Sequence, residues 1–313
     1  MQRRDFLAAA AAAPLAAAAT SIPVIDTHIH LYDPRRPEGI PWPPKNAPMY
    51  WPALPDGYRK LTKAHNVVGA IEVECSPWLE DNQWVLDIAA KDTIVVGMIG
   101  NLEPSKPDFN KQLDRFAKNP LFRGIRYGNL WDRPGIHAEL KKPEFIAGLK
   151  RMAAGGLTLD TANPTVELLE DLIQVGDKVP DLKIVIDHLP KIVVPADAKS
   201  KAAYTAAVRT LASRPKVYVK VSAVLNKVNG KTVTDLAQYK PKIDFLYDSF
   251  GQDRLLYGSD WPNSETVGNY AQVFNIVKTY FDAKGPAVAE KYFWKNSIAA
   301  YNWVHREKAQ PGK

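Results

Sequence analysis

The sequence predicts a single (β/α)₈ barrel, and three observations favour this fold. Strand-like apolar segments alternate with helical patterns from Pro23 to the end of the chain, which is typical of parallel sheets with crossover helices. Eight such units match a closed barrel better than an open doubly wound sheet. The sequence also contains no Gly-rich nucleotide-binding turn and no phosphate-binding loop, which would have favoured the open sheet.

The eight strands are expected in chain order, each followed by a helical window. They are expected at residues 23–31, 67–76, 94–102, 121–127, 157–162, 183–189, 217–224 and 255–260. Phe109, Leu113 and Phe116 show the helical spacing that follows the third strand. The Pro- and Trp-rich segment 34–55 interrupts the alternation as a long loop after the first strand. In a barrel, such a loop lies over the end where catalysis occurs.

The N-terminus has a different character from the rest of the chain. Arg3-Arg4-Asp5-Phe6-Leu7 precede an Ala-rich run to Ala19, the layout of a bacterial twin-arginine export signal. The run is too short and too weakly apolar to span a membrane. We therefore expect a signal peptide at residues 1–20, a barrel at 21–307 and a frayed tail at 308–313, and we expect a periplasmic or secreted protein.

Charge and cysteine content limit the classes of partner. The net charge of the 313-residue chain is +7, but its basic residues are scattered, so no groove for nucleic acid is indicated. Cys75 is the single cysteine, which excludes an intramolecular disulfide. The expected partner is a small-molecule substrate.

Three histidines and one aspartate fall at the carboxyl ends of strands, where barrel enzymes carry their catalytic groups. His28 and His30 are two residues apart and therefore share one face of the first strand. His188 ends the sixth strand and Asp260 the eighth. An aspartate beside imidazoles can take a proton from water while the imidazoles, or a metal they hold, polarise a carbonyl group. Asp26 is expected on the same inward face, one layer lower, in a structural role.

Arg126 is the first candidate for substrate binding, because a guanidinium can make a forked contact with a carboxylate or sugar hydroxyl. Arg123 lies three residues earlier, on the opposite face, so only one of the two is expected to enter the barrel. Glu74 and Ser76 share one face of the second strand and are expected to face the lumen, with Cys75 on the other face.

Three further residues complete the expected substrate pocket. Lys220 lies at the end of the seventh strand. Tyr50 and Trp261 could form walls for a ring-shaped substrate, as aromatic faces do for sugars and planar acids.

The ordered motifs resemble those of the amidohydrolase superfamily. They are Asp26-Thr27-His28-Ile29-His30, Ile186-Asp187-His188 and Gly258-Ser259-Asp260-Trp261-Pro262. Within the superfamily, they look like the amidohydrolase-related branch that contains sugar-lactone, pyrone-dicarboxylate and muconolactone-type lactonases. The resemblance covers nearly all of the chain after the signal. It implies a (β/α)₈ barrel and hydrolysis of a small lactone, derived from a sugar acid or a dicarboxylate, by a water that Asp260 activates.

The chain departs from the metal pattern of that superfamily. Many members bring a Lys or Glu from the fourth strand and a His from the fifth, whereas the matching positions here carry Arg126 or Tyr127 and Asp160 or Asn163. A bridged two-metal site is therefore not expected. Either one divalent ion, with zinc the expected metal, binds His28, His30 and Asp260, or the site works without a metal.

Two other functions remain open at this point. A metal-dependent decarboxylase or hydratase of the same superfamily would need a firmly bound ion, and the missing fifth-strand histidine argues against it. A periplasmic binding protein on an inactive barrel is a different class. Retention of Asp260 together with three strand-end histidines argues against that function.

Overall fold

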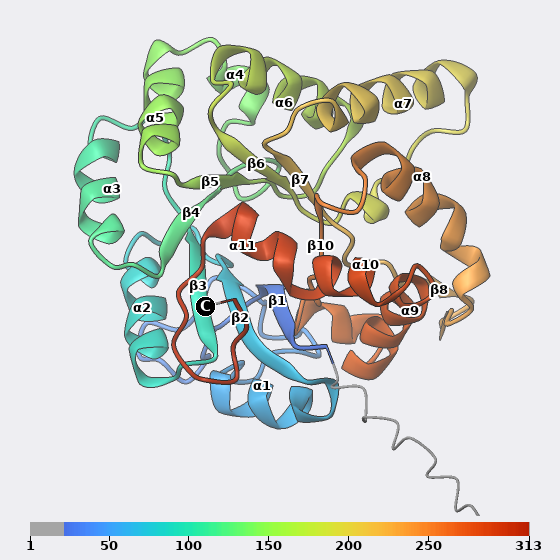
Figure 1. The fold of residues 1–313 in the computed structure, drawn as a ribbon. Coiled ribbons are helices and arrows are strands. Elements are labelled where there is room, and N and C mark those ends of the chain that lie inside the picture. Colours follow the sequence, from blue (N-terminus) through green and yellow to red (C-terminus); the bar gives the residue numbers. More distant parts are fainter. Residues whose placement is uncertain (1–21, 313) are drawn as a thin grey trace, which may run out of the picture.

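The computed structural model describes residues 22–312, and its centre is a barrel of eight parallel strands, as predicted (Figure 1). The strands are β1 (Val24–Ile29), β2 (Val67–Val73), β3 (Val95–Gly100), β4 (Phe122–Arg126), β5 (Thr158–Asp160), β6 (Lys183–Ile186), β7 (Val217–Lys220) and β10 (Leu255–Leu256). Each lies within its expected range and ends earlier than expected, because the following residues leave the sheet for the loops at the barrel mouth. The expected export signal at 1–20 lies outside the described residues.

The barrel closes where the eighth strand meets the first. Consecutive strands pair in chain order from β1 to β7, and β10 pairs with β7. Beyond β10, a parallel bridge joins Ile29 to Trp261, and the backbone N–H of His30 donates to the carbonyl of Trp261 at 2.8 Å. Gly258 permits this approach, because a Cβ atom there would lie 2.8 Å from the Cβ of His28.

Helices surround the barrel on its outside (Figure 1). They are α1 (Pro55–Thr62), α2 (Asp81–Lys91), α3 (Phe109–Ala117), α4 (Ile136–Glu139), α5 (Pro143–Ala154), α6 (Val166–Lys178), α7 (Ala198–Ala212), α8 (Lys240–Phe250), α9 (Tyr270–Asp282), α10 (Pro286–Glu290) and α11 (Asn296–Tyr301). A short hairpin, β8 (Lys227–Val228) and β9 (Lys231–Thr232), lies between β7 and α8. No helix within residues 22–312 is both long enough and apolar enough to cross a membrane.

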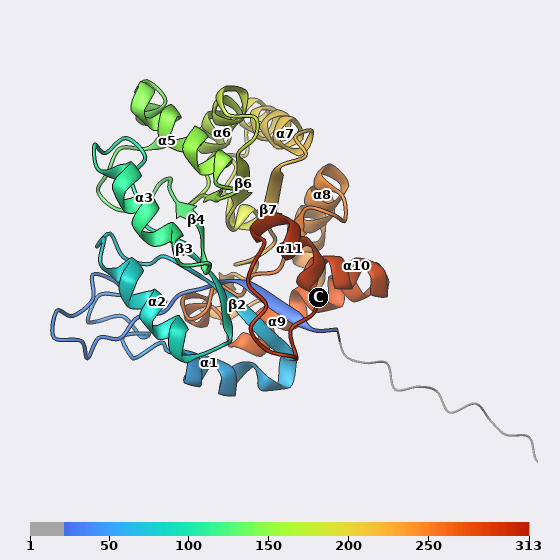
Figure 2. The ribbon, with the colours of Figure 1, turned by 60° about the vertical axis from the view of Figure 1, so that its left-hand side comes forward.

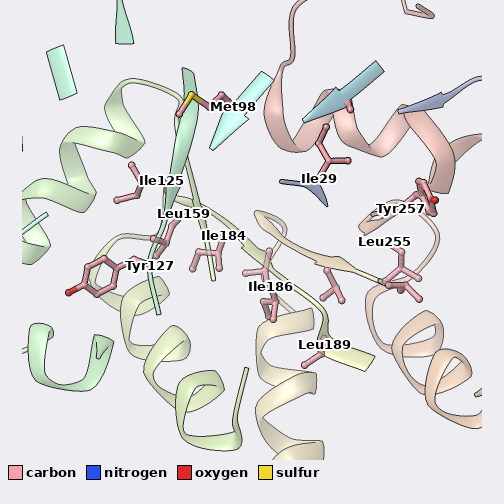
Figure 3. Close-up of a cluster of buried hydrophobic side chains, with 14 of the residues drawn as sticks. Ile29, Met98, Ile125, Tyr127, Leu159, Ile184, Ile186, Leu189, Leu255 and Tyr257 are labelled. Atoms are coloured by element: carbon pink, nitrogen blue, oxygen red, sulfur yellow. The ribbon is translucent and has the colours of Figure 1, made fainter. Parts of the chain in front are cut away.

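Two clusters of buried apolar side chains stabilise the barrel. The larger cluster fills the space between strands and helices, and Figure 3 shows its members on successive strands, among them Ile29, Met98, Ile125, Ile184 and Tyr257. The smaller cluster fills the inside of the barrel. Its strand residues are Ile25, Ile71, Val73, Val96, Ile99, Val185, Tyr218 and Leu256. Burial of apolar surface on both faces is what a parallel barrel requires.

The two ends of the barrel are covered differently. The loop of residues 30–54 covers one end, where the indole of Trp42 lies 5.6 Å from the ring of His30, centroid to centroid. Figure 2 shows this loop, in blue, on the side away from α11. At the other end, Tyr301 and Trp303 join the inner cluster. Within the segment 308–313, Gln310 is 3% exposed, and its amide donates to the carbonyl of Val68.

Candidate active site

His28 and His30 project into the barrel from β1 and are both buried. Their rings lie almost perpendicular to each other, at 88°, with centroids 4.9 Å apart. Asp26 does not share their face, which corrects the expected position. Its carboxylate accepts a hydrogen bond from the hydroxyl of Tyr58 on α1 at 2.6 Å. The strand pairing shifts between Asp26 and Ile29, and such an irregularity changes the face that a residue presents.

Asp260 and His188 stand at strand ends in an unusual backbone conformation. Their φ angles are +60° and +50°, in the left-handed region that non-glycine residues rarely occupy. Such residues cost about 1–3 kcal/mol each and gather at functional sites. The sharp turn directs both side chains toward the histidines of β1.

The Oδ1 atom of Asp260 is the centre of the site. It lies 3.3 Å from Nε2 of His30, 3.6 Å from Nε2 of His188 and 3.9 Å from Nε2 of His28. The other carboxylate oxygen, Oδ2, accepts a hydrogen bond from the amide of Asn263 at 2.8 Å. Within residues 22–312, Oδ1 of Asp260 and Nε2 of His28 have no hydrogen-bond partner although both are buried. A buried polar atom without a partner is costly, so these atoms are available for a ligand.

Burial and the neighbouring rings determine which groups carry charge. Burial by itself would raise the pKa of Asp260, but the imidazoles of His188, His30 and His28 outweigh it and hold that pKa well below its usual range. Burial is the main cause that lowers the pKa of His188 to about 4 and the pKa of His28 well below its usual value. At neutral pH the site therefore holds the carboxylate of Asp260 beside the neutral imidazoles of His28 and His188.

A second layer of charged groups lies beneath His28. The amine of Lys220, which is fully buried, lies 2.8 Å from Oδ2 of Asp160, 2.9 Å from Oδ1 of Asp187 and 3.2 Å from Nδ1 of His28. The hydroxyl of Tyr301, which reaches up from the closed end, donates to Asp160 at 2.7 Å. Burial raises the pKa of Asp160 to about 6.

His28, His30 and Asp260 form a potential metal site, because one atom from each lies within 4.8 Å of the others. The far nitrogen of each ring decides whether Nε2 offers a lone pair. Nδ1 of His30 lies 2.7 Å from the carbonyl of Val73 and must donate to it, so Nε2 can accept or coordinate. Nδ1 of His28 instead faces the amine of Lys220. His30 and Asp260 therefore fit a cation, whereas His28 in this arrangement does not.

A cavity of about 190 Å³ opens above these groups. Its wall includes His30, Trp42, Cys75, Arg126, Trp131 and His188. The volume suits a small organic molecule, and both aromatic faces and polar groups line it.

Sequence comparisons show to which family the chain belongs. A family model described as Amidohydrolase matches residues 25–303. The chain belongs to the amidohydrolase family. It is 30% identical over 249 residues to an L-fucono-1,5-lactonase of Burkholderia ambifaria, covering 79% of this chain and 82% of that protein. It is also 22% identical to an L-rhamnono-gamma-lactonase of Scheffersomyces stipitis, covering 89% and 98%.

Solved structures share the amidohydrolase barrel. An amidohydrolase from Burkholderia multivorans with bound zinc superposes with a TM-score of 0.77 at 21% identity, covering 90% of this chain and 99% of that one. At this identity the likeness establishes only the fold of this amidohydrolase.

Among the expected substrate residues of the amidohydrolase, Arg126 lines the cavity. Its Nε donates to Oε1 of Glu74 at 3.2 Å, and Nη2 donates to the backbone carbonyl of Glu74. Arg123 lies near the opposite end of β4, in a separate cavity beside α3 and α5. Arg126 is therefore the arginine that faces the site.

The side chains at the end of β2 face the other way from the expectation. Cys75 lines the mouth cavity, whereas Glu74 and Ser76 line a neighbouring cavity against α2. The alternation starts from Ile71 and Val73, which pack inside the barrel, so Cys75 is next on the inward face. Glu74 contacts the cavity wall through its hydrogen bonds with Arg126 and Trp131.

Three other expected contacts are also corrected. Lys220 points into the barrel but lies beneath His28, fully buried, and does not line the cavity. Trp261 packs outside the lumen against Trp51, because its neighbour Asp260 takes the inward face. Tyr50 is half-buried in the loop and is absent from the lining of the mouth cavity.

Further residues support this amidohydrolase site, and among them Asn263 was not identified from the sequence. Asn263 holds Asp260, and Ser222 lies 2.8 Å from Nδ1 of His188. The indole of Trp131 donates to Glu74 at 3.1 Å. Asn263 follows Asp260 by three residues and could have been found as a cap of the turn after the eighth strand. Trp131 does line the cavity, as its aromatic ring suggests from the sequence.

Proposed function

We propose that this amidohydrolase opens a small lactone, derived from a sugar acid or a dicarboxylate, with a water that Asp260 activates. The observation that carries the proposal is the Oδ1 atom of Asp260. It is a buried carboxylate oxygen without a hydrogen-bond partner among residues 22–312, and three imidazole nitrogens surround it at 3.3–3.9 Å. A water in this space would meet a proton acceptor on one side and imidazoles on the others.

In the proposed reaction, the water oxygen attacks the carbonyl carbon of the lactone while one water proton passes to Asp260. His30, whose Nε2 presents a lone pair, orients the water, and His28 and His188 polarise the carbonyl oxygen, which gains negative charge. The bond from the carbonyl carbon to the ring oxygen then breaks, and that oxygen takes the proton from Asp260. The product is a hydroxy acid. Because Asp260 is a carboxylate at neutral pH, the base is in its active form before substrate arrives.

The relatives support the substrate class. The two curated relatives named above carry the names of lactonases acting on deoxy-sugar acids. Arg126 lines the cavity, and the carboxylate of Glu74, 3.2 Å away, balances its charge. The guanidinium can therefore donate hydrogen bonds to hydroxyl groups, but its positive charge attracts a dianion only weakly. A polyhydroxylated lactone therefore fits better than a dicarboxylate.

We also propose that the reaction is independent of a divalent metal. The contact between Lys220 and His28 supports this proposal. A histidine that coordinates a metal through Nε2 carries its hydrogen on Nδ1 and donates it to an acceptor, but Nδ1 of His28 faces the amine of Lys220. A metal-dependent decarboxylase gains no support from the fifth strand, where Asp160 pairs with Lys220 and contributes no histidine.

We further propose export by the twin-arginine pathway. The paired arginines Arg3 and Arg4 before the Ala-rich run support it.

A lactone panel, followed with a pH indicator in buffer with and without a chelator, tests the substrate and the metal together. We expect hydrolysis of at least one sugar-acid lactone, at equal rates in both buffers. Hydrolysis of none of the panel would overturn the lactonase proposal. A rate lost on chelation and restored by zinc would overturn the metal-independent reaction alone.

A further inference from the structure

The buried amine of Lys220 has three neighbours and three hydrogens. An ammonium group offers three N–H donors and no acceptor. The amine donates to Oδ2 of Asp160 at 2.8 Å and lies 3.2 Å from Nδ1 of His28, within hydrogen-bond distance, and Oδ1 of Asp187 is an ion-pair partner at 2.9 Å. Two of these neighbours are carboxylates, which pair with the ammonium form.

This arrangement decides where His28 carries its proton. If Nδ1 of His28 held the proton, that N–H would point at an N–H of Lys220 at 3.2 Å, donor against donor. The nearest other acceptor, Oδ1 of Asp187, lies 3.6 Å from Nδ1, which is too far for a hydrogen bond. A neutral imidazole whose Nδ1 accepts carries its hydrogen on Nε2.

We infer that Lys220 fixes His28 as an Nε2–H donor, so that His28 binds an oxygen atom of water or substrate and excludes a metal from the ready cluster of His28, His30 and Asp260. Lys220 is thus a positioning residue that acts through His28. The two strand-one histidines then differ in role, because His30 donates through Nδ1 to Val73 and presents a lone pair at Nε2.

The neighbours of Nε2 agree with a donor there. Nε2 of His28 has no hydrogen-bond partner among residues 22–312, and it faces Oδ1 of Asp260 across 3.9 Å. A donor and a carboxylate oxygen at this separation leave a gap that an oxygen atom can bridge. A cation there would need Nε2 to lose its hydrogen, which requires the bond between Lys220 and His28 to break.

The first test is made on the unaltered, metal-free protein and needs no variant to fold. Long-range ¹H–¹⁵N spectra of protein labelled in histidine distinguish the two tautomers, and we expect the Nε2–H form for His28. A signal of the Nδ1–H form for His28 would overturn the inference. The inference about His28 deepens the proposed function and rests on it only for the identity of the oxygen atom that His28 binds. A lactone panel without hydrolysis would therefore leave the tautomer result unaffected.

The second test measures zinc affinity by competition with a chelating dye. We expect Lys220→Met to bind zinc at least tenfold more tightly than the wild type, because Nδ1 of His28 becomes free to carry the proton. Lys191→Met is the control for charge: it removes a cation that lines the mouth cavity and leaves the contact between Lys220 and His28 in place. Tyr301→Phe is the control for the buried network, since it removes a hydrogen bond to Asp160 alone.

Thermal unfolding of each variant checks that the barrel is intact. Equal zinc affinity in Lys220→Met and the wild type would overturn the inference, as would an equal gain in Lys191→Met. Comparison of the variants also assigns the His28 signals. They alone should change from the Nε2–H to the Nδ1–H pattern in Lys220→Met, and they should stay unchanged in Tyr301→Phe.

Discussion

The side-chain amide of Asn263 donates to Oδ2 of Asp260 at 2.8 Å, and this contact gives the two carboxylate oxygens different roles. Oδ2 is held, so Oδ1 faces the imidazoles. The turn that begins at Asp260 supplies both groups, since Asn263 opens the short 3₁₀ helix that follows it. The proposed base is thus oriented by a side chain of its own loop.

Asp260→Asn should lower kcat for lactone hydrolysis by about 10³-fold, because general-base catalysis contributes roughly 10²–10⁴-fold and an amide cannot take the proton. Steady-state kinetics on the best lactone of the panel measures this. Asn263→Ala is the matched variant, since it frees the carboxylate without removing it, and should cost about tenfold. Full activity in Asp260→Asn would exclude Asp260 as the base.

Glu74→Gln should shift substrate preference toward lactones that carry a carboxylate. Glu74 balances the guanidinium of Arg126 at 3.2 Å, so its neutralisation makes the cavity more positive. A change of about 1 kcal/mol in this field corresponds to roughly fivefold in the ratio of kcat/KM for acidic over neutral lactones. Arg126→Lys, which keeps the charge but loses the fork, should leave that ratio nearly unchanged while raising KM. An unchanged ratio in Glu74→Gln would remove Arg126 from substrate recognition.

The stabilising effect of His188 should depend on pH in a defined window. Burial lowers its pKa from 6.5 in the unfolded chain to about 4 in the fold. Between these values the unfolded state binds more protons at this residue, so stability contributed here falls as pH falls. The free energy of unfolding of the wild type, relative to His188→Gln, should drop by about 3 kcal/mol from pH 6.5 to pH 4. Chemical denaturation at several pH values measures it, and a flat difference would contradict the buried neutral imidazole.

Asp26→Ala should destabilise the barrel without acting on catalysis directly. The carboxylate of Asp26 accepts hydrogen bonds from Tyr58 at 2.6 Å and from the backbone N–H of Ser259 at 2.8 Å, which ties β1 to α1 and to the closing strand. Loss of buried, charge-assisted hydrogen bonds should cost about 2–3 kcal/mol in the free energy of unfolding. Asp33→Ala is the control, since Asp33 pairs with the exposed Arg35 and should change stability by less than about 1 kcal/mol.

Replacement of Arg3 and Arg4 by lysine should stop export, because the paired arginines are the feature that the twin-arginine pathway reads. Cell fractionation in a bacterial host, with an unaltered copy as reference, follows the protein. Continued accumulation outside the cytoplasm would contradict the proposed route.

The alternation of side chains along strands and the positions of the strand ends predicted the fold and the cluster of His28, His30, His188 and Asp260. His28 and His30 share a face because they are two residues apart, and barrel geometry alone brings His188 and Asp260 to the same end. These inferences need only the period of a strand and the chain order. All eight strands were therefore found within their expected ranges.

The errors arose at two points. One was which of the alternating residues of a strand face inward, and the other was how deep in the barrel a side chain lies. Glu74 and Ser76 were expected inward because they are polar, but the apolar Val73 fills the barrel and fixes the opposite register. Lys220 does point inward, yet it lies one layer below the cavity. The stagger of neighbouring strands sets that layer, and it depends on pairing irregularities such as the one after Asp26 that no periodic pattern reveals.

The joint between Ile29 and Trp261 makes the site a property of the complete chain. His28 and Asp260 stand on either side of this seam, one near the first residue of the barrel and the other near the last, and Gly258 lets the two segments touch. A nascent chain that is still emerging from the ribosome therefore has histidines but no base opposite them. Hydrolysis starts only when the last strand has docked, so activity reports directly on completed folding. Loss of that docking, by a side chain at position 258, would disassemble the catalytic groups while leaving seven strands to pair in order.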